Sequence, residues 1–156
     1  MSKRIIIVGP GGSGKDHLRK RLEKKGFRHS VSCTSRPMRE GEIDGVDYHF
    51  KDESFFLNNP SQFIEMEKFN GWYYGTTHTE FLKSDVMVIT PGGVYNLPKD
   101  IVENSFIVYI NPHESIRRER LNARKDADST ERRINADRTD FENFNIFDLQ
   151  VKNEDF

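Results

Sequence analysis

The N-terminal stretch of the chain is the feature that most constrains its fold. Four consecutive β-branched residues, Ile5 to Val8, lead directly into the glycine-rich segment 9–14. An apolar run without polar alternation is typical of a strand buried on both faces, as in a parallel sheet. Good helix formers follow from Lys15 to Lys25, and Gly26 stands where a helix C-cap is expected. The sequence therefore predicts a strand, a tight turn and a helix in that order.

The predicted turn matches G-x-x-x-x-G-K, the P-loop pattern that binds nucleotide phosphates. Its glycines let consecutive backbone N–H groups converge on a phosphate, and the helix N-terminus adds partial positive charge. Lys15 would reach the β- and γ-phosphates, and Asp16 stands where a Ser or Thr normally binds Mg²⁺. A carboxylate is also a hard oxygen ligand, so we expect Mg²⁺ as cofactor and Asp16 as its candidate ligand. The expected ATP-phosphate site is Gly11, Gly12, Ser13, Gly14, Lys15 and Asp16.

In the rest of the chain, predicted strands alternate with predicted helices, as they do in an α/β fold. Apolar runs at 86–89, 106–110 and 147–151 predict further strands, and 115–121 and 129–144 are helical in composition. The intervening part, from Ser30 to about Thr77, is rich in Phe and Tyr. We expect it to form an inserted, mixed or antiparallel lobe. The fold prediction is thus a parallel sheet flanked by helices with this lobe inserted.

Composition excludes several classes of function. The 156 residues favour a single domain, and 24 Lys and Arg against 25 Asp and Glu give a formal net charge of -1. That balance lacks the broad positive charge that binds a nucleic-acid polymer or an anionic membrane. The lone cysteine, Cys33, has no disulfide partner, and the N-terminus has neither a signal peptide nor a membrane-spanning pattern. We expect a soluble cytoplasmic protein, a monomer or a homodimer.

Three separated motifs behind the P-loop resemble those of the guanylate kinases. They are SVSCTSRPMREGEIDGVDYHF at 30–50, FIE at 63–65 and GWYYGT at 71–76, followed by an arginine-rich segment. The resemblance implies transfer of the γ-phosphoryl group of ATP to GMP or dGMP, giving ADP and GDP or dGDP. It also implies one domain over 1–156, divided into a core (1–29, 78–116 and 140–156), a monophosphate-binding lobe (30–77) and a short Arg-rich lid (117–139).

The same resemblance implies roles for individual residues. It places Ser32 and Glu65 at the guanine, with Thr76 beside the base. A carboxylate can accept hydrogen bonds from guanine N1–H and N2–H₂, whereas adenine presents a lone pair at N1. At the GMP phosphate it places Arg36, Arg39, Tyr48 and Tyr74. As catalytic groups it implies Lys15, Arg120, Arg124 and Arg133, and on the adenine side Asn153.

Two departures from the family pattern keep other functions open. One is Asp16 in the P-loop, and the other is Thr90-Pro91-Gly92-Gly93, where the family carries an acidic stretch. Asp16 could take over the missing carboxylate, or the chain could be a non-catalytic guanylate-kinase-like binding module. A deoxynucleoside monophosphate kinase with altered base preference, or a P-loop kinase for another small acceptor, are the remaining alternatives.

Overall fold

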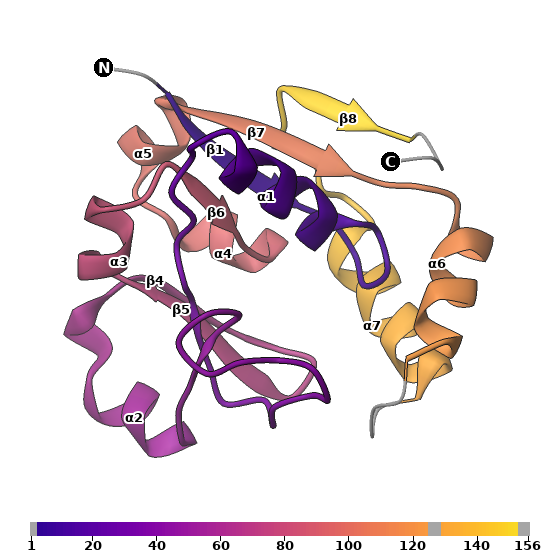
Figure 1. Cartoon of the computed structure of the whole chain (residues 1–156), viewed down its shortest axis with the longest axis horizontal. Helices are drawn as coiled ribbons and strands as arrows, with labels where there is room; N and C mark the ends of the chain where they lie inside the picture. Colours follow the sequence, from indigo (N-terminus) through magenta and orange to yellow (C-terminus); the bar gives the residue numbers. More distant parts are fainter. Residues whose placement is uncertain (1–2, 125–128, 153–156) are drawn as a thin grey trace.

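The computed structural model, which describes residues 3–124 and 129–152, contains two separate four-stranded sheets (Figure 1). The first has the strand order β6-β1-β7-β8, and every pairing in it is parallel. Its strands are β1 (Arg4–Val8), β6 (Val86–Val88), β7 (Ser105–Ile110) and β8 (Leu149–Val151). The parallel core sheet predicted from the apolar runs is confirmed.

Both faces of this sheet are covered, as its unbroken apolar strands require. On one face Ile7 of β1 packs near Leu18 and Leu22 of α1 (Lys15–Lys24). On the other face Ile6 and Val8 join a cluster that includes residues of α4 (Pro91–Asn96) and the aromatic end of α7 (Thr130–Phe141). Alternate residues of one strand therefore serve two cores, and the P-loop leaves β1 from between them.

Helix α1 ends where the sequence predicted. Gly26 has a φ of 95°, a left-handed conformation that glycine adopts without strain. Its N–H donates to Glu23 O, and the N–H of Phe27 donates to Leu22 O, which together form a Schellman cap. The cap stops the helix after the third turn and returns the chain to the sheet edge.

The second sheet has the order β3-β2-β5-β4 and is mixed, with β2 parallel to β3 and antiparallel to β5. It has its own apolar centre, in which the rings of Phe56 and Phe63 stack at 5.1 Å. Phe56 belongs to a short helix, α2, that the sequence did not indicate. The elements here are β2 (Cys33–Thr34), β3 (His49–Phe50), α2 (Glu53–Asn58), the 3₁₀ turn η1 (Pro60–Gln62), β4 (Phe63–Phe69) and β5 (Trp72–Thr77).

The remaining helices differ from the sequence expectations mainly at their ends. Helix α4 was not predicted; it begins within the stretch at 90–93, because Thr90 accepts a hydrogen bond from Gly93 N and Pro91 occupies the first turn. The expected helix at 129–144 ends at Phe141, and the last strand begins at Leu149. The other helices are α3 (His78–Leu82), α5 (Lys99–Glu103) and α6 (Glu114–Asn122).

Helices α6 and α7 lie on one side of the P-loop and the lobe lies on the other (Figure 1). Arg132 of α7 bridges toward the lobe, donating to Asn70 O at 3.2 Å in the turn between β4 and β5. Within residues 3–124 and 129–152, none of the helices has the length and apolar character needed to cross a bilayer.

Candidate functional site

One cavity of about 470 Å³ lies between the P-loop, the second sheet and the α6–α7 pair. Its walls carry Lys15 from the P-loop, Glu65 from β4 and Arg133 from α7. A volume of this size suits a ligand of nucleotide dimensions rather than a single ion. Each of the three parts contributes charged groups, so the cavity is built for a charged ligand.

The P-loop turn depends on glycine at positions where no side chain would fit. A Cβ on Gly9 would lie 2.6 Å from Ile110 O, and one on Gly12 would lie 2.8 Å from Arg117 O. Gly12 and Gly14 also have φ values of 74° and 100°. The turn therefore packs directly between the end of β7 and the backbone of α6.

Lys15 is folded back onto the loop, with its Nζ donating to Gly9 O at 2.5 Å. Burial lowers the pKa of Lys15, and the carboxylates of Asp137 and Asp16 oppose that shift. Ser13 lines the same cavity with a buried hydroxyl that has no hydrogen-bond partner among the described residues. A buried polar atom without a hydrogen-bond partner is expected at a site where a polar ligand supplies that partner.

Asp16 follows Lys15 at the start of α1, and its side chain is 75% exposed and lines the cavity. Within the described part of the chain it forms a loose ion pair, with Oδ1 3.4 Å from Arg19 Nε. The described residues hold no group of three or more His, Cys, Asp or Glu placed around one ion. Mg²⁺ is commonly held by one or two carboxylates together with substrate phosphates and water. Asp16 therefore fits a Mg²⁺ ion that enters with a nucleotide.

A buried carboxylate stands at the lobe side of the cavity. Glu65 is 5% exposed, and its Oε1 accepts a hydrogen bond from Thr76 Oγ1 at 2.8 Å. Ser32 Oγ lies 3.4 Å from the same threonine oxygen. Burial raises the pKa of Glu65 to about 7, against the lowering effect of the Thr76 hydrogen bond. Thr76 is fully buried behind Glu65, so it orients the carboxylate and does not line the cavity.

Another wall of the cavity is formed by arginine and tyrosine side chains. Arg36 forms a two-pronged ion pair with Glu42 at 3.0 and 2.9 Å, and its guanidinium lies 5.3 Å from the centre of the Tyr48 ring. Tyr48 and Tyr74 pack edge to face at 6.1 Å. Arg39 also lines the cavity, and Glu42 accepts from its backbone N–H at 2.7 Å. Two guanidinium groups and two phenols thus surround one part of the cavity, a set that suits a phosphate.

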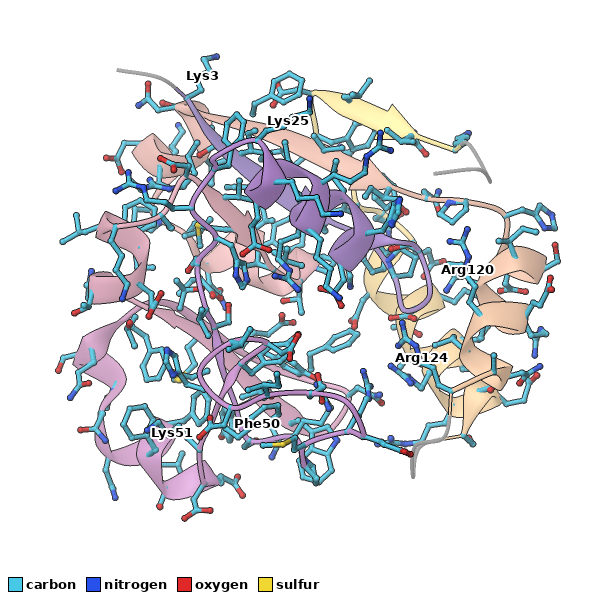
Figure 2. All side chains as sticks on the ribbon, viewed as in Figure 1. Lys3, Lys25, Phe50, Lys51, Arg120 and Arg124 are labelled. Atoms are coloured by element: carbon cyan, nitrogen blue, oxygen red, sulfur yellow. The ribbon has the colours of Figure 1, made fainter. Side chains whose placement is uncertain are left out.

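Helix α6 and the start of α7 bring arginines to the P-loop. Figure 2 shows Arg120 and Arg124 projecting from the α6 side toward the P-loop turn. Arg120 donates to Gly12 O at 3.1 Å. Arg124 and the buried Arg133 line the cavity, and their charges lower the pKa of Lys15. The cations that the sequence placed in one segment therefore converge on the phosphate loop.

Two comparisons with known proteins bear on this arrangement. The guanylate kinase family model matches residues 1–156. The chain belongs to the guanylate kinase family. The fold is also similar to the crystal structure of a guanylate kinase from Anaplasma phagocytophilum, with a TM-score of 0.73, 22% sequence identity, and coverage of 98% of this chain and 77% of that one. Membership of the family supports a nucleoside monophosphate kinase, and the structural match shows that the chain has a guanylate kinase fold.

The guanylate kinase resemblance had singled out residues in all three parts of the molecule, and the structure gathers most of them. Except for Thr76 and Arg120, the described ones line the cavity. Thr76 and Arg120 each donate a hydrogen bond to a residue that lines the cavity, Thr76 to Glu65 and Arg120 to Gly12. Asn153 lies outside the described residues.

Two acidic residues at this guanylate kinase site were not found from the sequence. Asp137 of α7 lines the cavity and accepts a hydrogen bond from Gly11 N at 2.9 Å. Glu67 of β4 accepts from the Thr90 hydroxyl, and a side chain on Gly92 would overlap the Glu67 carboxylate. A carboxylate thus stands beside the Thr90–Gly93 segment after all, supplied by the lobe. A signal for Asp137 was its place four residues after Arg133, on the same face of α7.

The raised pKa of Glu65 predicts a specific loss of stability with pH. The folded state holds the Glu65 proton to about pH 7, whereas the unfolded chain releases it near its ordinary value. Stability from this group is therefore present at low pH and falls between about pH 4.5 and 7, by about 3 kcal/mol in full.

Urea unfolding of the unmodified chain and of Glu65→Gln at pH 5 and pH 8 measures this effect. The difference in unfolding free energy between the two proteins should shift in favour of the glutamine variant as pH rises, because glutamine has no proton to lose. A difference that stays constant from pH 5 to pH 8 would contradict the burial of an uncompensated Glu65 charge.

Proposed function

We propose that this chain transfers the γ-phosphoryl group of ATP to GMP or dGMP, giving ADP and GDP or dGDP. The observation that carries the proposal is the opening of the P-loop and of the buried Glu65 pocket into one cavity. A donor-phosphate cradle and a base-reading carboxylate in a single space fit a two-substrate phosphoryl transfer.

On the donor side, the P-loop amides and Lys15 bind the ATP phosphates. To do so Lys15 exchanges its hydrogen bond to Gly9 O for a phosphate oxygen. Asp16 would hold Mg²⁺, which neutralises phosphate charge when it is bound. The loop is fixed between β7 and α6, so its backbone is in place before the phosphates bind.

On the acceptor side, Glu65 selects the base. Thr76 donates to Oε1 of Glu65, which leaves Oε2 and the remaining lone pairs for N1–H and N2–H₂ of guanine. Arg36, Arg39, Tyr48 and Tyr74 then bind the monophosphate of the acceptor. The two tyrosines contribute hydroxyl donors without adding charge.

The lid arginines stabilise the charge of the group in transfer. Arg124 and Arg133 line the cavity near Lys15, and phosphoryl transfer depends on positioning and electrostatics more than on covalent chemistry. Their charge would be worth most with water excluded, and the hydrogen bond from Arg132 to Asn70 O links α7 to the lobe.

A second candidate is a guanylate-kinase-like module that binds an acceptor-shaped ligand without catalysis. One observation favours it: the carboxylate of Asp137 occupies the Gly11 amide of the P-loop. An intact P-loop with Lys15 favours the kinase, because a binding module has no need of an ATP cradle.

A coupled assay of ADP release separates the two candidates. The chain is given ATP, Mg²⁺ and each of GMP, dGMP, AMP, CMP, UMP and TMP in turn. We expect turnover with GMP or dGMP, loss of turnover in Lys15→Ala, and little change in Lys20→Ala, which removes an exposed lysine from the same helix. No ADP above background with any acceptor would favour the binding module.

Base discrimination is expected to depend on Glu65. Glu65→Gln should reduce the preference of kcat/KM for GMP over AMP, because an amide can present either a donor or an acceptor to the base. Loss of a matched partner changes selectivity by up to about 10⁴ in favourable cases. Glu53→Gln is the control, since it removes an exposed carboxylate of the same lobe that does not line the cavity. An unchanged ratio in Glu65→Gln would show that another group reads the base.

The role of Asp16 predicts a change in metal dependence. Asp16→Ala should raise the Mg²⁺ concentration for half-maximal rate and lower kcat, because the metal loses its carboxylate ligand. Asp16→Ser should retain or improve activity by restoring the hydroxyl usual at this position. Titrations of rate against Mg²⁺ measure both, and an alanine variant that matches the unmodified chain would remove Asp16 from the metal site.

A further inference from the structure

Asp137 is a buried acid whose position the proposed reaction does not explain. It lies on the inner face of α7 and is 4% exposed. Its Oδ2 accepts a hydrogen bond from Gly11 N at 2.9 Å, and a Cβ added to Gly11 would lie 3.3 Å from the same oxygen. A residue 126 positions along the chain thus places a carboxylate against the phosphate loop.

The surroundings of Asp137 are those of a bound anion. Arg117 Nη1 lies 3.6 Å from Oδ2 and also 3.5 Å from Gly11 O. Burial raises the pKa of Asp137, and the charges of Lys15, Arg117 and Arg133 oppose that shift. Asp140, one turn further along α7, adds negative charge nearby. Asp137 therefore has a backbone N–H donor and three cations, the partners that a phosphate oxygen would use in the P-loop.

We propose that the Asp137 carboxylate occupies a phosphate-binding position of the P-loop. In this position it docks helix α7 on Gly11, and it has to leave the Gly11 amide when the donor phosphates bind. This inference rests on the proposed function in one respect only, the use of the P-loop by phosphates. One N–H cannot serve two anionic oxygens at full strength, and the like charges repel. Asp137 thus weakens donor binding and couples it to movement of α7.

Competition with phosphate and a purely structural role of Asp137 predict opposite changes in anion affinity when Asp137 is replaced. If Asp137 only held the lid in place, its removal would loosen the P-loop and weaken anion binding. If it competes with the phosphates, its removal strengthens anion binding. Asp137→Asn separates the two, because asparagine keeps an oxygen that can accept from Gly11 N while losing the negative charge.

The experiment is calorimetric titration of the full chain with pyrophosphate, without acceptor or divalent cation. Asp137→Asn should bind pyrophosphate about tenfold more tightly than the unmodified chain, through loss of one nearby like charge. Asp140→Asn is the matched control, a carboxylate on the same helix with no hydrogen bond to the P-loop among those described. It should change the affinity less than about twofold. Asp137→Ala, which removes the oxygens altogether, is expected to bind at least as tightly as the asparagine variant.

Several results would overturn the proposal. Binding by Asp137→Asn that is equal to or weaker than that of the unmodified chain would do so, as would equal tightening by Asp140→Asn. Failure of both Asp137 variants to fold, or to bind pyrophosphate at all, would assign Asp137 a structural role instead. The proposed function is tested separately. ADP formation with GMP, without tighter pyrophosphate binding by Asp137→Asn, would reject only the competition between Asp137 and phosphate. Tighter binding without ADP formation would reject only the kinase activity.

Discussion

The close approach of the Gly9 backbone to Ile110 O is the constraint on which the site depends. With no room for a Cβ at Gly9, the turn after β1 packs directly against the end of β7, and Gly12 packs equally closely against the backbone of Arg117. The turn is therefore held by two segments far from it in sequence. Its position sets where α1 begins and where α6 and α7 dock.

The lobe adds a second constraint, the burial of Glu65. A carboxylate in this environment is costly to ionise, and its cost is reduced by the Thr76 hydroxyl and would be reduced further by donors on a ligand. The same desolvation that lowers stability at neutral pH sharpens discrimination, because a base without N–H donors would leave the carboxylate unpaired. Stability and selectivity are thus opposed at this residue, as is common at functional sites.

The parts of the fold that were predictable from the sequence rest on local patterns. The unbroken apolar run of β1, the glycine turn and the cap at Gly26 each follow from a few neighbouring residues. Helix α2 could not be predicted in this way, because its six residues are held by the stacking of Phe56 on Phe63 and not by helix propensity. Family resemblance supplied Glu65 and the lid arginines as candidates. Asp137 was missed because its contact with Gly11 exists only once α7 has docked.

A single bisubstrate ligand tests the central claim that the donor loop and the Glu65 pocket form one site. The ligand joins adenosine and guanosine, 5′ to 5′, through five phosphates, and its binding is measured by calorimetry against the diadenosine compound of the same length. The account predicts one molecule bound per chain, with the guanosine-containing ligand at least about tenfold tighter. Equal affinity for the two compounds, or two molecules bound per chain, would contradict it.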